Sequence, residues 1–457
     1  MPRLAGTAGA AGAAGVAAAG QSFSTPGSQT QDWLTLLRRS FEAAVAAADP
    51  RQHLAEFLPP VPRGQTLVVG AGKAAASMAA AVEAAWPSGA ALSGLVITRY
   101  GHGLPLRRIR CVEAGHPVPD AAGEQAAQEI LQRVSALEPQ DQLIVLVSGG
   151  GSSLLALPVE GVSMADLKGL TADLLRSGAP ITDMNVVRKH LSRIQGGRLA
   201  LASKAPVTAV VISDVVGDAP SAIASGPCAA DPSTYADALE VLTRWQVSPP
   251  ASIADHLARG LRAEASETPK PGDPRLSHVT TQMLATARQS LKAAAQVFAE
   301  SGVRPVILGD AVTGEARDVA TGFASWVREL AQDQDPQFAR PLVLLSGGEC
   351  TVTVRGSGRG GRCAEFLLAM GLAVESLGVA DRVYGLAADT DGIDGASPHA
   401  GALLCPQTLR LARSQGINPR RALDANDVLS VFEPLGRVVT TGPTLTNVND
   451  YRAVLVV

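Results

Sequence analysis

Glycine-rich turns that directly follow apolar runs are the feature that most constrains how this chain folds. Five segments share the pattern of a short apolar run, which predicts a strand, followed at once by small or polar residues: Gly70–Ala75, Ser148–Ser153, Ser213–Asp218, Ser346–Glu349 and Ala388–Gly395. Glycine in such a turn lets the backbone approach an anion, and N–H groups at the start of a following helix carry partial positive charge. One such turn is ordinary in a parallel sheet, whereas five together indicate a phosphorylated ligand.

The elements between these turns alternate in type. Continuous apolar runs at 66–69, 143–147 and 207–212 predict buried strands, and apolar residues at helical spacing separate them. Strands that alternate with helices predict an α/β fold with a parallel sheet covered on both faces. We therefore expect a Rossmann-like three-layer N-terminal domain, a second α/β domain, and an active site in the cleft between them.

The length of the chain, 457 residues, suits two large domains. A cluster of prolines marks 263–275 as the linker, which places the N-terminal domain at 32–262 and the C-terminal domain at 276–457. Residues 1–31 are rich in Ala, Gly and Ser and carry a single charged side chain. We expect a disordered extension there, with a transit peptide as the alternative.

Composition excludes several classes of function. The net charge is −3, no basic stripe is present, and aromatic residues make up only 4%, so we expect neither a nucleic-acid nor a membrane partner. No apolar run approaches the roughly 20 residues that span a bilayer. The five cysteines are scattered and form no CxxC pair, which argues against a structural zinc site and favours a reducing cytoplasm. Small molecules are the expected partners, and a homodimer stays open.

The first glycine-rich turn fits two kinds of ligand. Gly70-x-Gly72-x-x-Ala75 matches the dinucleotide fingerprint, and Arg99 near the end of the next predicted strand suits the 2′-phosphate of NADP. Lys73 lies inside the turn, however, where its ammonium group provides a point charge for a bound anion. The GxxxxGK[ST] spacing of a P-loop is absent, so a kinase built on this turn is not of the Walker type.

The second turn suits a carboxylate or phosphate because it offers hydroxyls and backbone donors after a buried strand. Its candidate binding residues are Ser148, Gly149, Gly150, Ser152 and Ser153. Arg188 is a further candidate, on a helix that we expect to begin at Asn185 and to end near Gly197. An ordinary charged helix face is the alternative for this arginine.

The third turn carries two carboxylates just past a strand end. Asp214 and Asp218 flank Val215-Val216-Gly217. Magnesium usually takes one or two carboxylates together with substrate phosphates, so Asp218 is a candidate ligand of Mg²⁺. Asp214 is a candidate acceptor for the proton of a substrate hydroxyl. Helix capping or turn chemistry is the alternative for both residues.

The last two turns place candidates in the C-terminal half. Binding candidates there are Gly347, Gly348, Glu349 and Asp391. Arg362 ends the flexible run 356–362, and its planar guanidinium suits bidentate recognition of phosphate oxygens and stabilisation of charge during phosphoryl transfer. A short RGG-like nucleic-acid segment is the alternative for this run.

These motifs, in this order, resemble the class II glycerate 2-kinases, from about residue 30 to the C-terminus. The segments that carry the resemblance are Ser148–Leu155, Asn185–Ala200, Ser213–Pro227, Ser346–Arg362, Thr390–Gly395 and Gly442–Asp450. The resemblance implies a Rossmann-like domain, a C-terminal MOFRL domain, and ATP-dependent phosphorylation of D-glycerate at its 2-hydroxyl. For such a reaction we expect ATP and Mg²⁺ as cofactors. It also places the active-site lysine at Lys73 and the active-site arginine at Arg362.

The sequence departs from the family pattern at a few positions. Cys363 and Ala364 stand where Asn-Gln is usual, Leu445 replaces a glycine, and Gln195 replaces a lysine. Glu365 remains as a binding candidate, so we expect the chemistry to survive, with Lys73, Arg362 and Asp214 as the catalytic residues. Two alternatives stay open: an NAD(P)H-dependent hydroxypyruvate reductase, since members often carried that label, and a non-catalytic metabolite-binding homologue.

Overall fold

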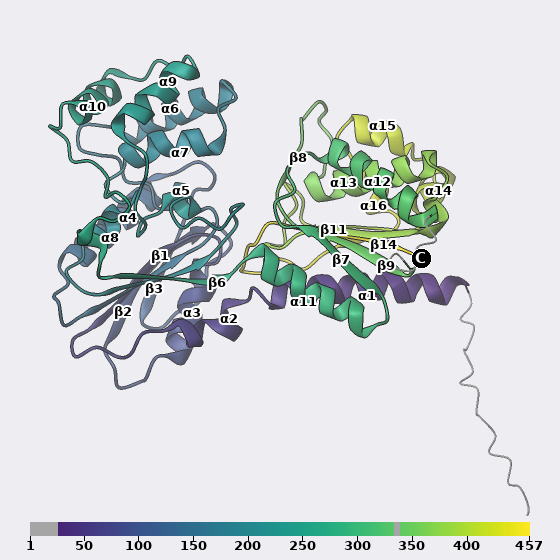
Figure 1. Cartoon of the computed structure of the whole chain (residues 1–457), viewed down its shortest axis with the longest axis horizontal. Helices are drawn as coiled ribbons and strands as arrows, with labels where there is room; N and C mark the ends of the chain where they lie inside the picture. The colour runs from purple at the N-terminus through teal and green to yellow at the C-terminus, as the bar shows by residue number, and fades with distance from the viewer. Residues whose placement is uncertain (1–25, 333–338) are drawn as a thin grey trace, which may run out of the picture.

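The computed structural model describes residues 26–332 and 339–457 and shows two α/β domains, each built on a six-stranded sheet (Figure 1). The chain starts in the second domain, builds the whole first domain, and then returns to complete the second. This confirms the predicted fold class. None of the described helices is long and apolar enough to cross a membrane. The part of the predicted N-terminal extension that precedes Pro26 lies outside the described residues.

The sheet of the first domain is entirely parallel, in the order β3-β2-β1-β4-β5-β6. Its strands are β1 (Thr66–Ala71), β2 (Leu92–Arg99), β3 (Ile109–Ala114), β4 (Gln142–Val147), β5 (Val207–Ile212) and β6 (Val279–Ala285). The strands β1, β4 and β5 are buried along their whole length, as their continuous apolar runs predict. Since the strand order reverses between β1 and β4, the loops after these two strands lie side by side.

Helices cover both faces of this sheet. The helix α3 (Ala75–Ala85) packs on one face, and α4 (Ala121–Ser135) with α8 (Arg198–Leu201) packs on the other. A separate helical layer with its own apolar core extends from the first domain (Figure 1). Its helices are α6 (Met164–Arg176), α7 (Ile181–His190), α9 (Tyr235–Arg244) and α10 (Ala251–Leu261). The short elements are α2 (Pro50–His53), α5 (Gly151–Leu154), η1 (Leu54–Phe57), η2 (Ile223–Ser225) and η3 (Pro274–Leu276).

The sheet of the second domain is mixed, in the order β13-β12-β11-β14-β9-β7, with β7 and β9 parallel and the other neighbours antiparallel. Its strands are β7 (Arg304–Gly309), β9 (Leu342–Ser346), β11 (Val383–Asp389), β12 (Gly401–Leu404), β13 (Val438–Val439) and β14 (Asp450–Val456). The two-residue strands β8 (Gly314–Glu315) and β10 (Cys350–Thr351) pair separately.

Helices again cover both faces. On one face pack α1 (Pro26–Ala46) and α11 (Ala287–Glu300), which run side by side under the sheet (Figure 1). On the other face pack α12 (Ala316–Gln332), α13 (Arg362–Ser376), α14 (Thr408–Ser414), α15 (Pro419–Asp424) and α16 (Leu429–Phe432). The single turn η5 (Ala380–Arg382) leads into β11.

The domain boundaries differ from those that the sequence predicts. The predicted linker 263–275 is packed on the first domain, where Thr268 is buried and bonds to Asp231. The strand β6, expected in the second domain, pairs with β5 because its residues complete the first sheet. Conversely α1, expected in the first domain, buries its apolar stripe against α11 and the second sheet.

The predicted helix from Asn185 to Gly197 is also shorter than expected. The helix α7 begins earlier, at Ile181, and ends at His190. Gly196 and Gly197 both have positive φ angles, 60° and 81°, so they form a turn that only glycine adopts without strain.

Candidate functional site

The loops after β1 and β4 interlock at the point where the strand order reverses. The backbone N–H of Lys73 donates to the carbonyl of Gly149 at 2.8 Å, and the N–H of Ala74 donates to Oγ of Ser148 at 3.1 Å. Gly72, with a φ of 140°, lies against the Ser148 backbone and leaves no room for a Cβ atom. The first turn therefore needs its second glycine for close packing, and that packing fixes the direction of Lys73.

The Lys73 side chain reaches into the second domain. Its Nζ lies 2.5 Å from Oδ2 of Asp391, a carboxylate in the loop after β11 that is almost fully buried. Burial alone would lower the pKa of Lys73, but the carboxylates of Asp391 and Asp389 raise it above its ordinary value. Lys73 is therefore a cation fixed between the two domains.

Arg362 begins α13 and is held by three carboxylates. It bonds to Oδ1 of Asp450 at 2.7 Å and to Oδ2 of Asp389 at 2.7 Å, and it lies 3.2 Å from Oε1 of Glu349. Burial lowers the pKa of Arg362, and these three carboxylates raise it by more. Asp389 also accepts the backbone N–H of Asp391 at 3.0 Å, so the arginine and lysine sites share one loop.

Asp214, at the end of β5, faces the same group of charges. Its carboxylate accepts from Nδ2 of Asn447 at 3.3 Å, and its backbone carbonyl accepts from Nδ2 of Asn449 at 2.5 Å. Burial raises the pKa of Asp214 to about 6, with the charge of Lys73 opposing the shift. A carboxyl group with this pKa is suited to accept a proton near neutral pH.

Asp218 lines a small polar cavity with Asp214, between the loop after β5 and the second domain. The residues around it are Ser213, Asp214, Val215, Val216, Gly217, Asp218, Ala287, Asp310 and Asn449. Within the described residues, no three or more His, Cys, Asp or Glu side chains are grouped so as to hold a metal on their own. Hard carboxylate oxygens in such a cavity nevertheless fit magnesium, which takes one or two carboxylates and completes its shell with phosphates and water.

The loop after β4 bonds mainly to its own domain. Oγ of Ser152 lies 2.8 Å from Oγ of Ser225, and Oγ of Ser153 donates to the carbonyl of Gly150 at 3.1 Å. Gln195, which stands where the family usually has lysine, is buried and donates to the carbonyl of Ser152 at 2.8 Å. The loop is therefore rigid before any ligand binds.

Arg188 stands out because its charge has no partner. It lies one helical turn after Asn185, whose Oδ1 accepts from Ser225 at 3.3 Å. The guanidinium is half-buried and makes no hydrogen bond or ion pair within the parts of the chain that the structure describes. Burial lowers the pKa of Arg188. A largely desolvated cation of this kind fits an anionic ligand.

Some predicted binding residues do not join this group. Gly70 is buried inside β1, where a Cβ would meet the backbone of Leu146. Glu365 is buried in the second domain, where it pairs with Arg317 at 2.7 Å and accepts from Asn426 at 2.9 Å. Gly347 and Gly348 act through their backbone, because their carbonyls accept from Arg452 and from the N–H of Asp450 respectively.

The departures at Cys363 and Ala364 lie at the start of α13, directly after Arg362. Both side chains are buried in the apolar core of the second domain. Their backbone N–H groups donate to the carboxylate of Asp394 at 3.0 and 2.9 Å, which caps the start of α13. Asp394 therefore fixes the helix from which Arg362 projects, and it does so without the two missing polar side chains.

Four residues of the site were missed in the sequence. Asp389 and Asp450 hold Arg362, while Asn447 and Asn449 bond to Asp214 across the domain boundary. Asp389 lies in the predicted turn Ala388–Gly395, and the other three lie in the final NVND run at 447–450. Nothing in their spacing indicated which partner each side chain would meet.

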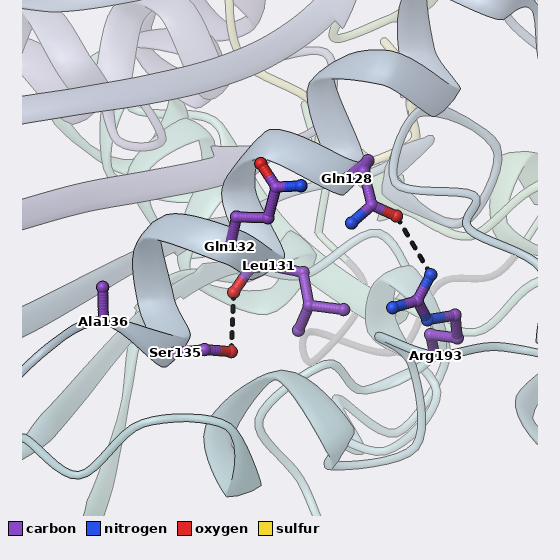
Figure 2. Close-up of a pocket in the computed structure, with 6 residues that line it drawn as sticks. All are labelled: Gln128, Leu131, Gln132, Ser135, Ala136 and Arg193. Carbon is purple, nitrogen blue, oxygen red and sulfur yellow. Dashed lines mark hydrogen bonds between the residues drawn. The ribbon is translucent and has the colours of Figure 1, made fainter.

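A larger and more open pocket lies on the outer side of α4 (Figure 2). Its lining is Gln128, Leu131, Gln132, Ser135, Ala136 and Arg193. Arg193 donates to Oε1 of Gln128 at 3.0 Å, so its charge is not aimed at a ligand. None of the site residues discussed above lines this pocket. The candidate site is therefore the group of charged residues between the domains.

Comparisons with known proteins agree with this architecture. Residues 36–258 match a domain of unknown function, DUF4147, and residues 342–450 match the MOFRL family. The chain is 47% identical over 424 residues to a protein of Agrobacterium vitis that is provisionally named hydroxypyruvate reductase, covering 92% of this chain and 94% of that one. It is 38% identical over 391 residues to the glycerate 2-kinase of Pyrococcus horikoshii, covering 85% of this chain and 86% of that one.

A solved structure is similar over almost the whole chain. The crystal structure of glycerate kinase from Thermotoga maritima superposes with a TM-score of 0.82 and 35% sequence identity. The match covers 94% of this chain and 100% of that one. Both domains, and their order along the chain, are therefore shared.

Proposed function

Because the chain belongs to the class II glycerate 2-kinase family, we propose that it transfers the γ-phosphoryl group of ATP to the 2-hydroxyl of D-glycerate, giving 2-phospho-D-glycerate and ADP. The observation that carries the proposal is the gathering of Lys73, Arg362 and Asp214 at the boundary between the domains. Two fixed cations can stabilise the charge on the transferred phosphoryl group, and a carboxyl with a raised pKa can accept the proton of the hydroxyl.

Asp214 is the proposed general base. The 2-hydroxyl loses its proton to the Asp214 carboxylate while its oxygen forms a bond to the γ-phosphorus, and the bond from that phosphorus to the bridging oxygen of ADP breaks. A pKa of about 6 leaves the carboxylate ionised at neutral pH yet basic enough to accept a proton. The amides of Asn447 and Asn449 orient it from the second domain.

Lys73 and Arg362 are proposed to stabilise the charge on the transferred group. Phosphoryl transfer relies mainly on positioning and electrostatic stabilisation, so no covalent intermediate on the protein is needed. In the structure both cations are paired with carboxylates of the loop after β11. These carboxylates keep both side chains charged and hold them in place for incoming phosphate oxygens.

Binding roles follow from the loops around this centre. The turn at Ser148–Ser153 and the unpaired Arg188 are proposed to hold anionic groups of the substrates. Asp218 is the proposed holder of Mg²⁺, which would supply neutralisation of phosphate charge when bound. Domain closure would exclude water from the site and so limit hydrolysis of ATP.

The proposed partners are D-glycerate and ATP, and the proposed location is the cytoplasm. All five cysteines are free thiols, which is usual for a protein of a reducing compartment.

A coupled assay tests the function directly. The protein is incubated with ATP and D-glycerate, ADP formation is followed, and the product is identified by NMR as 2- or 3-phosphoglycerate. Formation of 2-phosphoglycerate with a Mg²⁺ requirement is the expected result. ADP formation that does not depend on glycerate, or a 3-phospho product, would contradict the proposal.

Hydroxypyruvate reduction is the second candidate, because the first turn fits a dinucleotide and lies at the position where the strand order reverses. It predicts NADPH oxidation with hydroxypyruvate and no dependence on ATP. Running both assays on the same preparation separates the two activities, and inactivity in both would favour a non-catalytic metabolite-binding protein.

A further inference from the structure

Two more loops reach the Lys73 end of the first sheet, after β2 and β3. Arg99 is the last residue of β2, the loop after it carries the Gly101-His102-Gly103 run, and the loop after β3 carries His116. In a parallel sheet the carboxyl ends of all strands lie along one edge, so both loops border the turn that holds Lys73. His116 packs against Gly150, since a Cβ on this glycine would meet both the imidazole and the Lys73 side chain.

His102 is buried with its polar atoms unused. Only 2% of its surface is exposed, and neither ring nitrogen has a hydrogen-bond partner of good geometry among the described residues, although the ring lies close to the Lys73 backbone. The loop itself is well held, because the N–H groups of Gly101 and Gly103 donate to Oε1 of Glu113 at 2.9 and 2.8 Å. Burying an imidazole whose ring nitrogens have no hydrogen-bond partner costs free energy, unless a bound ligand supplies the missing hydrogen bond.

Arg99 is a second unsatisfied group at the same place. Its guanidinium is half-buried and has neither a hydrogen bond nor an ion pair within residues 26–332 and 339–457. The charge of Arg99 lowers the pKa of both His102 and His116. The charges of Lys73 and Asp391 also act on the pKa of these two rings. Arg99 and Lys73 are therefore two cations beside these rings. The carboxylate of Asp391 pairs with Lys73, and that of Glu113 accepts from the backbone N–H groups of Gly101 and Gly103, so neither is bonded to Arg99.

We propose that Arg99 and His102 form an oxyanion-binding subsite beside Lys73, which takes either the carboxylate of the hydroxy acid or a phosphate group of the nucleotide. The choice of these two ligands rests on the proposed function. The inference adds Arg99 and His102 to the residues proposed to bind substrate. Arg99 supplies a planar, permanently charged donor, and His102 supplies one neutral N–H donor.

The neutral state of the rings agrees with this role. Burial lowers the pKa of His102, with Arg99 adding to the effect, and burial and Lys73 lower the pKa of His116 to about 4. Both imidazoles are therefore uncharged at neutral pH. The subsite offers hydrogen bonds of fixed direction together with the charge of Arg99 and Lys73, and no carboxylate needs to leave Arg99 when an anion enters.

Steady-state kinetics with matched variants test the subsite. KM is measured for D-glycerate and for ATP with the wild type, Arg99→Gln, Arg99→Lys, His102→Phe and His102→Asn. The control is Arg107→Gln, an exposed arginine at the opposite edge of the same sheet. Loss of a charge-assisted hydrogen bond should raise one KM at least about tenfold in Arg99→Gln. Arg99→Lys, which keeps the positive charge, and His102→Asn, which keeps an N–H donor, should recover part of the loss.

The affected substrate identifies the anion. A raised KM for D-glycerate assigns the subsite to the carboxylate, and a raised KM for ATP assigns it to a phosphate. Both KM values within about twofold of the wild type in Arg99→Gln would overturn the proposal. Arg99 is half-buried, so this variant decides the question even if His102→Phe does not fold.

Failure of the proposed function gives a different result. If the wild type does not phosphorylate glycerate, inorganic phosphate and D-glycerate are titrated by calorimetry into the wild type and into Arg99→Gln. Binding to the wild type that weakens about tenfold in the variant keeps the subsite. Equal binding, or no binding of either anion by the wild type, removes it.

Discussion

Lys73 and Asp391 join the two domains: Nζ of the lysine, at the end of β1, lies 2.5 Å from Oδ2 of the aspartate, in the loop after β11. Two further hydrogen bonds join the domains: Oγ of Ser77 donates to the carbonyl of Leu445, and Nδ2 of Asn447 donates to the carboxylate of Asp214. The pair is therefore a structural contact as well as a candidate catalytic one, and a nucleotide phosphate that binds Lys73 competes with Asp391.

Replacement of Lys73 by alanine should lower kcat by at least about 10²-fold, the scale of losing one transition-state contact. The cause is loss of a positive charge that faces the transferred phosphoryl group. Turnover is measured in the coupled assay, with Lys292→Ala on the exposed side of α11 as the control. Near-normal turnover in Lys73→Ala would remove the lysine from the mechanism.

The rate should depend on the ionisation of Asp214. Because burial raises its pKa to about 6, the general base is protonated below this pH and ionised above it. We expect kcat to rise as the pH increases through about 6, and to fall about tenfold per pH unit below it. In Asp214→Asn the activity should be low and this rise should be absent. A wild-type profile that is flat from pH 5 to 8 would exclude Asp214 as the base.

Replacement of Arg362 should affect stability and activity together. Arg362→Ala leaves the buried Asp389 without its ion-pair partner and Asp450 with Arg452 as its remaining cation, which should lower the free energy of unfolding by about 3–5 kcal/mol. Arg362→Lys keeps the charge but loses the fork that bonds to both carboxylates, so it should fold and still lose turnover. Chemical denaturation and the coupled assay measure the two effects.

The control for Arg362 lies three residues earlier. Arg359 is largely exposed and pairs with Glu433 on the surface. Arg359→Ala should change the free energy of unfolding by less than about 1 kcal/mol and leave kcat intact. Equal losses in the two alanine variants would show that the inner carboxylates do not need Arg362.

Leu445 adopts a backbone conformation that favours glycine. Its φ is 63°, in the left-handed region that costs a non-glycine residue about 1–2 kcal/mol. Leu445→Ala and Leu445→Gly both remove the side chain, so the difference between them reports the backbone alone. We expect the glycine variant to be more stable by about 1 kcal/mol in thermal or chemical denaturation. An alanine variant that is equally or more stable would contradict this account.

Local patterns predicted the inner parts of both domains well. The apolar runs at 143–147 and 207–212 became β4 and β5, because a strand buried on both faces needs apolar residues throughout. The packing of β6 on the first sheet and of α1 on the second was not predicted, because neither element carries a local sign of the sheet against which it packs. Proline content at 263–275 indicated a break in regular structure, which was correct, but not a break between domains.

The sequence by itself determined the α/β class and the glycine turns at strand ends, and it nominated Lys73, Arg362 and Asp214 as candidates, since each of these depends on neighbours along the chain. The tertiary structure alone decided which carboxylates hold the two cations, and that Glu365 faces Arg317 instead. It also showed Arg99 and His102 beside Lys73. Such pairings join residues up to several hundred positions apart, and the order of strands in the sheets, not the periodicity of any segment, brings them within bonding distance.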